Sequence, residues 1–422
     1  MTHEAQAIIA DFLARGWDAS PEERTIALAT TDRGAIPVLV EGALEKIEKS
    51  VTFIDFAISF IDERELDEIV ARALQRFEQH PTSTMAESIL ARVSLQVPHL
   101  LTARLRDFWR LFPNPRSYCR TWPWRCADDA EIATLLEVAA SEHDAVSRAW
   151  QCLLQTRRPA IVGHAATALA TNTGHISREG WLEHVGFADE DGELVQLHQA
   201  PVWHVRFPPG FLDTRTRPPW IRPSAHPTWS AESRESPIPI TVGGQSDGTC
   251  PFCHDELRQL LDLPVVPAEE PADRAAPGPL RLVACLSCLG SEIDTLFYDH
   301  VNTRVPVGLN PEGRTTTPQF LAGPLRETKA TIVRIADRWA VQDWGFSNGR
   351  ENLHRVGGEP SWIQSAEYPK CLRCSRRMRF IAQLDSDLPT ENGGEWLWGS
   401  GGICYAFWCS VCRVSAVKWQ CT

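Results

Sequence analysis

The first half of the chain has the hydrophobic spacing of amphipathic helices. Between residues 64 and 77, apolar side chains recur every three or four positions and so fall on one face of a helix with 3.6 residues per turn. These residues are Leu66, Ile69, Val70, Leu74 and Phe77. Similar patterns occur over 85–111, 130–140 and 145–154. We therefore predict a helical domain over residues 1–195.

The stretch 144–171 predicts a pair of neighbouring helices. Arg157-Arg158-Pro159 separates the two halves, and proline is well tolerated in the first turn of a helix. Helical pairs of this kind are typical of α-solenoid repeats, but the sequence has no strict period. The pattern therefore allows either a helical bundle or a HEAT-like stack, and in both cases it predicts a scaffold or docking surface.

Prolines and aromatic residues dominate the next segment, 196–242. Prolines recur from Pro201 to Pro239, which excludes regular helix. Bulky side chains such as those of Trp203 and Trp229 lie between them, and such residues are uncommon in free linkers. We predict an extended segment that packs on the following domain through its tryptophans.

Size and charge restrict the class of partner. A chain of 422 residues that is 43% hydrophobic is long enough for two or three domains. Lysine and arginine total 42 against 54 aspartate and glutamate, and the net charge of -12 opposes binding to phosphate backbones. A local basic cluster does occur at Arg373, Arg376, Arg377 and Arg379. We expect a protein partner and no nucleic acid. A basic partner would suit the sign of the charge, although an acidic surface that only aids solubility is the preferred interpretation.

The start of the chain lacks the marks of a secretory signal. Met1-Thr2-His3-Glu4 has no basic segment, and no apolar segment follows it. The most apolar stretch, 51–61, is short and is interrupted by Asp55. We expect a cytoplasmic protein that does not span a membrane. Cytoplasmic thiols stay reduced, so metal binding, and not disulfide formation, is the leading use expected among the 13 cysteines.

Eight of these cysteines form four Cys-x-x-Cys pairs, or knuckles. The pairs are Cys250/Cys253, Cys285/Cys288, Cys371/Cys374 and Cys409/Cys412. Each knuckle can present two thiolates to one ion, and two knuckles complete a tetrahedral shell. The gap inside the first two knuckles is nearly as long as that inside the last two, which supports pairing consecutive knuckles. The sequence predicts two four-cysteine sites with two structural zinc ions.

Other uses of the cysteines remain open at this stage. A crossed pairing, a single site and redox dithiols are alternatives, and iron is the rival ion because similar knuckles occur in rubredoxin-like centres. Zinc is preferred because rubredoxin-like knuckles favour a following glycine, which none of these has. We consider His254 and Cys404 as substitute ligands. Buried apolar positions are expected for Cys119, Cys126, Cys152, Cys404 and Cys421.

The knuckles belong to a repeated sequence. Gly243-Gly244 precedes the first knuckle and Leu260-Leu261-Asp262 follows it. In the same order, Gly357-Gly358 precedes the third knuckle and Gln383-Leu384-Asp385 follows it. The glycines provide backbone freedom at a turn, and the apolar runs are short enough for strands, as is 404–409. We predict an α+β multidomain protein in which 243–422 is a β-rich domain of two duplicated four-cysteine zinc modules, 243–300 and 357–422.

The second module carries further recognisable segments. They are Gly357-Gly358-Glu359-Pro360-Ser361-Trp362, Met378-Arg379-Phe380-Ile381-Ala382-Gln383-Leu384-Asp385 and Trp408-Cys409-Ser410-Val411-Cys412. With the third knuckle they resemble the bacterial YwqG-like family of unknown function and, more distantly, programmed cell death protein 2. The resemblance covers 200–422, although the first module lacks the proline and tryptophan after its glycines. It implies protein binding, in toxin immunity or as a chaperone, and assigns no catalytic residues.

One catalytic motif has to be weighed against this interpretation. Gly244-Gln245-Ser246-Asp247-Gly248 matches G-x-S-x-G, but a nucleophile elbow needs a helix after the serine, and here a knuckle begins at Cys250. No metal-binding spacing is found among His204, His226, His300 and His354. Four thiolates also leave no open position on zinc. The sequence favours a zinc-stabilised cytoplasmic interaction protein without catalysis, and a hydrolase-type enzyme with a hidden site is the alternative.

Overall fold

The structure of the protein is a computed structural model with two units. It describes residues 1–15, 21–49, 53–112, 118–141, 143–199, 201–213, 226–230, 235–266, 279–289, 293–301, 305–318 and 320–422. The first unit comprises Met1–Val185 and Ala225–Pro227. The second comprises Gly186–Ser224 and Thr228–Thr422.

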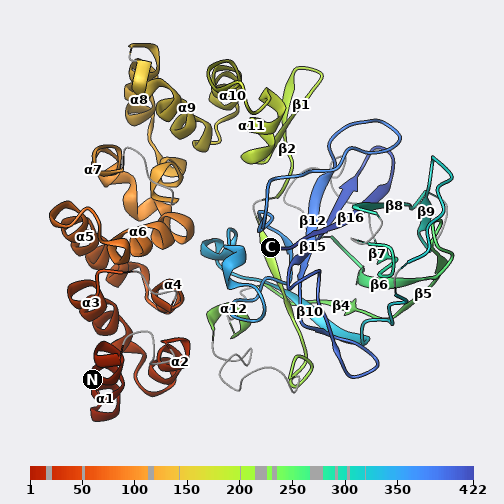
Figure 1. Cartoon of the computed structure of the whole chain (residues 1–422), viewed down its shortest axis with the longest axis horizontal. Helices are drawn as coiled ribbons and strands as arrows, with labels where there is room; N and C mark the ends of the chain where they lie inside the picture. Colours follow the sequence, from red (N-terminus) through yellow and green to blue (C-terminus); the bar gives the residue numbers. More distant parts are fainter. Residues whose placement is uncertain are drawn as a thin grey trace. The chain divides into compact units, whose positions relative to one another are not determined.

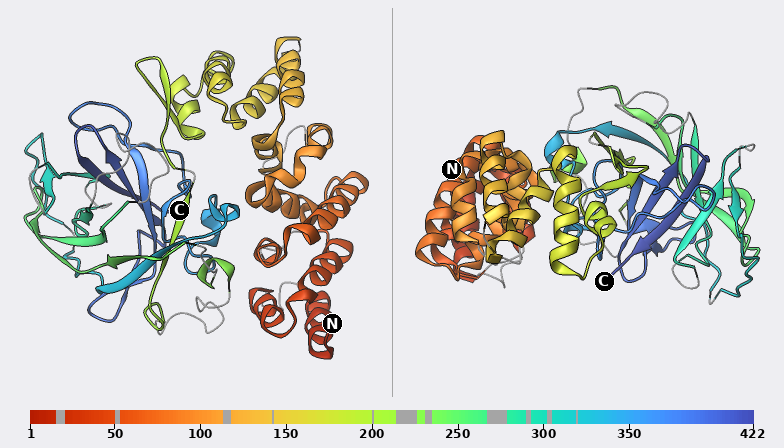
Figure 2. Two further views of the ribbon diagram at one scale, coloured as in Figure 1. Left: turned by 180° about the vertical axis from the view of Figure 1, so that it is seen from behind. Right: turned by 90° about the horizontal axis from the view of Figure 1, so that it is seen from above.

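The first unit is a series of helices (Figures 1 and 2). They are α1 (His3–Arg15), α2 (Pro21–Thr31), α3 (Ile36–Lys46), α4 (Phe53–Ile58), α5 (Glu63–Gln79), α6 (Thr84–Gln96), α7 (Leu105–Leu111), α8 (Asp129–Ser141), α9 (His143–Gln155), α10 (Pro159–Thr173) and α11 (Arg178–His184). Each packs mainly on helices close to it in the chain, as α9 does on α8 and α10. This arrangement is a stack and not a closed bundle. Among the described residues, no helix is both long and apolar enough to cross a membrane.

Local sequence explains where these helices begin and end. All five predicted apolar residues of α5 are buried, and the Asp62 side chain caps the helix by accepting the N–H of Glu65 at 3.0 Å. Pro159 begins α10 as predicted. The stretch 85–111, in contrast, is not one helix. It breaks after Gln96 because Pro98 has no N–H to continue the ladder.

The second unit is built from β-strands (Figure 1). They are β1 (Phe187–Glu190), β2 (Glu193–Gln196), β3 (Val202–Arg206), β4 (Ile238–Val242), β5 (Gln245–Thr249), β6 (Glu256–Leu263), β7 (Leu280–Ala284), β8 (Thr295–Asp299), β9 (Val307–Leu309), β10 (Thr328–Arg334), β11 (Arg355–Gly357), β12 (Arg379–Asp385), β13 (Leu388–Pro389), β14 (Glu395–Trp396), β15 (Ile403–Cys409) and β16 (Val414–Gln420). The main sheet has the order β5–β6–β4–β10–β3–β11–β12–β15–β16–β8–β9, with β7 paired to β6. Its ends approach each other at β5 and β9, which makes a nearly closed barrel.

The strand order has an internal two-fold pattern. β3, β4, β6 and β7 of the first half correspond to β10, β11, β12 and β15 of the second. The order β7–β6–β4–β10–β3–β11–β12–β15 is unchanged when corresponding strands are exchanged and the direction is reversed. The first strand of each half therefore lies within the other half: β3 pairs with β11, and β10 pairs with β4.

The pairing registers confirm the duplication. Val242 pairs with Leu261 in the first half, and Val356 pairs with Ala382 in the second. Leu261 and Ala382 are the same number of residues apart as Cys250 and Cys371. The strand pairing and the cysteines therefore give the same offset between the two repeats. A β-bulge follows the same point of the repeat in both halves, at Gln259 in β6 and at Phe380 in β12. Leu261 therefore corresponds to Ala382 in the repeat, two positions before Leu384.

Glycine is required where each half turns past the other. Gly243 and Gly357 have φ values of 73° and 71°, in the left-handed region. A Cβ at Gly243 would lie 2.5 Å from the carbonyl oxygen of Arg326, and one at Gly357 would lie 2.3 Å from that of Pro201. These carbonyls occupy equivalent places before β10 and β3. The paired glycines of the sequence thus allow the exchanged strands to approach closely.

Two predicted boundaries need correction. The second unit begins at Gly186 and not after residue 195, because the N–H of Leu197 donates to Gly186 and its carbonyl accepts the N–H of Phe380. The predicted extended segment 196–242 also does more than pack on the following domain, because parts of it are strands of the main sheet. It contributes β3 to the middle of the main sheet and β4 beside β10, and it contains the short helix α12 (Pro227–Ser230), although its proline density predicted no regular helix. Its parts 214–225 and 231–234 lie outside the described residues.

One hydrophobic core serves both halves of the second unit. Its buried side chains include Val242, Leu260, Leu282, Val356, Ile381 and Leu384. Because these come from both repeats, neither half has a separate core.

A buried arginine links β11 to the loops on either side of it. Arg355 is fully buried, and its Nη1 donates to Oε1 of Gln342 at 2.8 Å while Nη2 donates to Oγ of Ser361 at 3.1 Å. Gln342 in turn donates to a carboxylate oxygen of Glu351 at 3.0 Å. Burial lowers the pKa of Arg355 to about 10, so its guanidinium remains charged at neutral pH.

We expect Arg355→Ala to lower the free energy of unfolding by about 3–5 kcal/mol, because it leaves buried acceptors without their donor. Urea unfolding followed by tryptophan fluorescence measures this change. Arg314→Ala is the matched control, since the Arg314 side chain is 62% exposed, and it should change stability by no more than about 0.5 kcal/mol. Equal midpoints for Arg355→Ala and wild type would contradict a stabilising role for the network.

Candidate metal centres

Two turns bring the first four cysteines together. Cys250 and Cys253 lie in the turn between β5 and β6, and Cys285 and Cys288 lie in the turn that follows β7. The first turn is closed by the N–H of His254, which donates to the carbonyl of Cys250 at 3.0 Å. His254 adopts a φ of 63° to make this closure.

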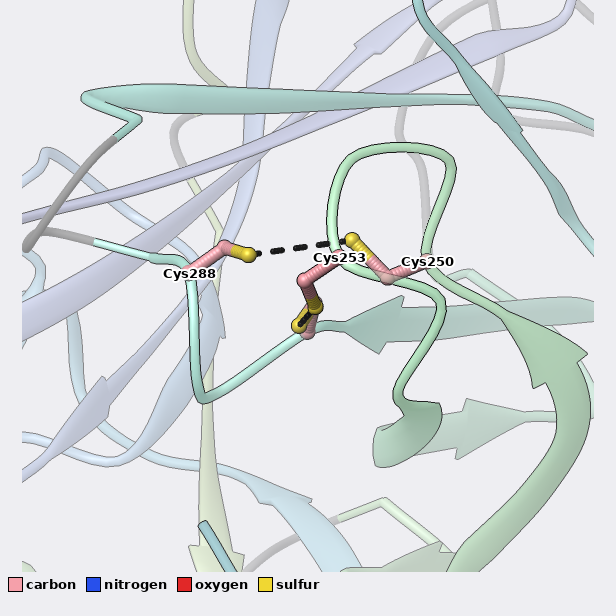
Figure 3. A group of neighbouring side chains, drawn as sticks. Cys250, Cys253 and Cys288 are labelled. Atoms are coloured by element: carbon pink, nitrogen blue, oxygen red, sulfur yellow. Dashed lines mark hydrogen bonds between the residues drawn. The ribbon is translucent and has the colours of Figure 1, made fainter. Parts of the chain in front are cut away.

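The spacing of the four sulfurs fits a tetrahedral metal ion. They lie within 4.8 Å of one another. The Sγ atoms of Cys250 and Cys288 are 3.9 Å apart, and those of Cys253 and Cys285 are 3.6 Å apart (Figure 3). Four sulfurs that each lie 2.3 Å from one ion are separated by about 3.8 Å, whereas a disulfide requires about 2.05 Å. All the cysteines are free thiols, so the four sulfurs are arranged in a way that could hold a metal ion.

The second cluster repeats this geometry. Cys371 and Cys374 lie in the turn before β12, Cys409 is the last residue of β15, and Cys412 lies in the turn between β15 and β16. Ser375, at the position equivalent to His254, has a φ of 60° and donates its N–H to the carbonyl of Cys371 at 2.9 Å. The Sγ atoms of Cys374 and Cys409 are 3.7 Å apart, and all four sulfurs lie within 4.8 Å. The structure therefore groups consecutive knuckles, as the spacing predicted.

Burial and neighbouring groups shift the pKa values of the thiols in opposite directions. Donation from the Cys285 thiol, with the backbone N–H of Phe252, lowers the pKa of Cys250 to about 5. Burial raises the pKa of Cys288 and of Cys409. A cluster of four thiolates needs a cation to offset desolvation and mutual repulsion. Metal binding must therefore displace the protons of the thiols whose pKa is raised.

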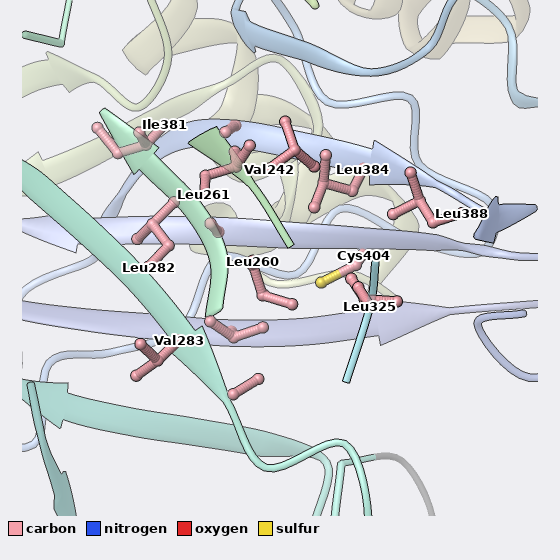
Figure 4. Close-up of a cluster of buried hydrophobic side chains, with 14 of the residues drawn as sticks. Val242, Leu260, Leu261, Leu282, Val283, Leu325, Ile381, Leu384, Leu388 and Cys404 are labelled. Carbon is pink, nitrogen blue, oxygen red and sulfur yellow. The ribbon is translucent and has the colours of Figure 1, made fainter. Parts of the chain in front are cut away.

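The substitute ligands considered from the sequence do not join either cluster in the described chain. His254 is exposed at the closing turn, and Cys404 is buried in the hydrophobic core with Leu325 and Leu384 (Figure 4). Among the other cysteines outside the clusters, Cys119 and Cys152 are buried as expected. Cys126 and Cys421 are only partly buried, which differs from the prediction.

The hydrolase motif lies in a context that does not suit a nucleophile elbow. Ser246 is part of β5, and the turn of the first cluster follows that strand in place of a helix. The four histidines singled out in the sequence belong to no metal-ligand group among the described residues. Of these, His300 packs against Trp408 with ring centroids 5.1 Å apart, and burial lowers its pKa to about 4.

Sequence reasoning missed a cleft beside the second cluster. Its volume is about 460 Å³. It is lined by Glu190, Asp191, Glu193 and Val195 of the β1–β2 hairpin, by Arg376, Arg377 and Arg379, and by Trp408, Cys409, Ser410 and Val411. The predicted basic cluster thus meets an acidic hairpin, and Arg376 lies 3.2 Å from a carboxylate oxygen of Asp191. No local pattern indicates this contact, because the two segments are far apart in the sequence.

Comparison with known proteins identifies a distant homologue. The uncharacterized protein YpfL of Salmonella typhimurium (strain LT2) is 36% identical over 205 residues, which cover 45% of this chain and 43% of that protein. The match therefore spans less than half of either protein. No family model matches the chain, and no solved structure matches it. Since the homologue is itself uncharacterised, function has to be argued from the site.

Purified protein is expected to contain two metal ions per chain, and Cys371→Ser with Cys374→Ser is expected to contain one, because the second shell loses two thiolates. Elemental analysis by inductively coupled plasma mass spectrometry gives the count. Cys250→Ser with Cys253→Ser is the matching change in the first cluster, and Cys404→Ser is the control that should keep both ions. Two ions in the Cys371/Cys374 variant would show that the second cluster is not a metal site.

Proposed function

We propose that this protein is a cytoplasmic protein-interaction module whose β unit is stabilised by two zinc ions. The observation that carries the proposal is that each cluster offers a complete set of four thiols whose sulfurs all lie within 4.8 Å of one another. Four protein ligands leave no position for a catalytic water. Ions held in this way contribute folding free energy and not reaction chemistry.

A protein is the proposed partner, and a basic surface would suit it. The net charge of -12 opposes phosphate backbones and favours positively charged surfaces. The local arginine cluster is partly neutralised, because Arg373 pairs with Asp299 and Arg376 pairs with Asp191. Stacked helices also provide an extended surface of the kind that repeat proteins use for binding.

We further propose that the β unit is distantly related to the YwqG-like proteins and to programmed cell death protein 2. The segments that carry this resemblance, Gly357-Gly358 and β12, are supported by their proximity, since β11 pairs with β12. Toxin immunity or chaperone-like holding of a client are the roles that follow from this relationship.

A hydrolase-type enzyme is the second candidate function. The cleft beside the second cluster favours it, because carboxylates and arginines converge there. Against it, Glu190 and Asp191 lie within 3.8 Å and 3.2 Å of Arg376, and such pairing suits structural carboxylates. Turnover of ester or peptide substrates that is lost in Glu193→Gln would favour the enzyme over the binding module.

Protein purified without added metal is expected to be colourless and to contain zinc. Zinc has a filled d shell, whereas iron bound by four thiolates absorbs visible light. A visible spectrum together with elemental analysis distinguishes the two ions. Stoichiometric iron with visible absorbance would overturn the zinc assignment while leaving both clusters as metal sites.

A tagged chain of residues 1–422 is expected to capture one stoichiometric protein from native lysate and to retain no nucleic acid at about 0.2 M salt. Mass spectrometry of the complex and its ratio of absorbance at 260 and 280 nm measure the two outcomes. An unrelated bait of similar net charge controls for capture by charge alone. Absence of any specific partner would overturn the interaction function.

A further inference from the structure

In the first module, the chain covers its own metal knuckles. The segment that follows β8 crosses the first knuckle, where the N–H of Thr316 donates to the carbonyl of Phe252 at 3.1 Å and the side chain of Asn310 donates to the carbonyl of Pro251 at 3.0 Å. Phe252 is only 8% exposed. The knuckle is thus packed under an extended segment.

An arginine and a serine hold the far part of the covering segment. Arg258 donates to the carbonyl of Ala322 from Nη2 at 3.2 Å, and the N–H of Ala322 donates to Oγ of Ser287 at 2.9 Å. Arg258 also pairs with the carboxylate of Glu256 at 2.6 Å. In the first module this arginine therefore has both a carboxylate and a backbone carbonyl as acceptors.

In the second module the β1–β2 hairpin lines the cleft beside the corresponding positions, but no described segment bonds to the backbone of the knuckles as Thr316 bonds to Phe252 in the first. By the register of the duplication, Leu372 corresponds to Pro251 and Val411 to Ser287. Leu372 is 44% exposed and Val411 is 66% exposed, whereas Ser287 is 1% exposed. Two apolar side chains are therefore in solvent where the first module is packed.

The arginine of the second module also lacks its acceptors. Arg379 corresponds to Arg258 and lines the cleft, and no acceptor within the described chain bonds its guanidinium. Arg377 replaces the carboxylate of Glu256 at the equivalent position. Of the three hairpin carboxylates that line the cleft, those of Glu190 and Asp191 pair with Arg376, and that of Glu193 pairs with no arginine of the described chain. In the first module the chain itself provides the acceptors for the arginine. In the second module an acceptor for Arg379 would have to come from another molecule.

We propose that the cleft beside the second cluster binds an extended peptide segment of a partner protein that carries a carboxylate next to an aliphatic side chain. The proposal rests on the proposed interaction function and locates its site. The bound segment takes the place that the chain's own segment has on the first module. Its carboxylate and a backbone carbonyl pair with Arg379, and its aliphatic side chain packs on Val411, which lines the cleft.

A display library of random peptides, each about 12 residues long, screened against the metal-loaded full chain tests this site. Enriched sequences are expected to place Asp or Glu beside Leu, Ile or Val. In fluorescence polarisation with a labelled enriched peptide, Arg379→Glu and Val411→Asp should each weaken binding by about tenfold or more. Lys329→Glu is the charge-matched control on β10, where the side chain is 80% exposed, and it should bind as wild type does.

Several results would overturn the proposal. The first is that the library yields no enriched peptide on the wild-type chain. The second is that both cleft variants retain two metal ions and bind the labelled peptide as tightly as wild type, and the third is that acetate at the same concentration competes as well as the peptide does. The fourth is that the chain self-associates and that the cleft variants abolish this self-association. The first three remove the peptide site, and the last makes a second copy the occupant. If wild type and the cleft variants capture the same lysate partner equally, this inference fails but the interaction function stands. If wild type captures no partner, the function itself fails.

Discussion

The convergence of four cysteine sulfurs at each of two points is the constraint on which the β unit depends. Each cluster connects the turn before one strand with the turn after the strand paired to it. In the first cluster, Cys250 before β6 lies beside Cys288 after β7. The cluster therefore clamps the ends of a paired strand. Burial makes charged thiolates costly there, so the sheet geometry and a bound cation are expected to stabilise each other.

The clamped strand pairs are combined by exchange of strands between the two repeats. β3 and β10 lie at the centre of the sheet, and each pairs with the other repeat as well as with its counterpart. This exchange explains why Gly243 and Gly357 must be glycine, since the crossing carbonyls leave no room for a side chain. It also explains why the repeats share one core and behave as one folded unit.

The duplication makes the differences between the repeats informative. The framework of turns, bulges and sulfur clusters is the same in both, so it accounts for stability without accounting for function. The two repeats differ in what lies over the knuckles and in the charge around the equivalent arginines, Arg258 and Arg379. In the first repeat, Arg258 bonds to the carbonyl of Ala322 within the chain. In the second repeat, the equivalent Arg379 lines a cleft. The second repeat is therefore where an external ligand has groups left to bind.

The sequence by itself determined the features that depend on local spacing. The helical period predicted α5 and its buried face, and two-residue spacing between cysteines predicted the knuckles and their grouping. Only the tertiary structure decided the start of the β unit at Gly186, the central place of β3 and the cleft between the acidic hairpin and Arg379. These features depend on pairing between segments that are distant in the chain. Strand exchange and side-chain contacts of that kind leave no period or short motif in the sequence, because their partners are chosen by packing in three dimensions.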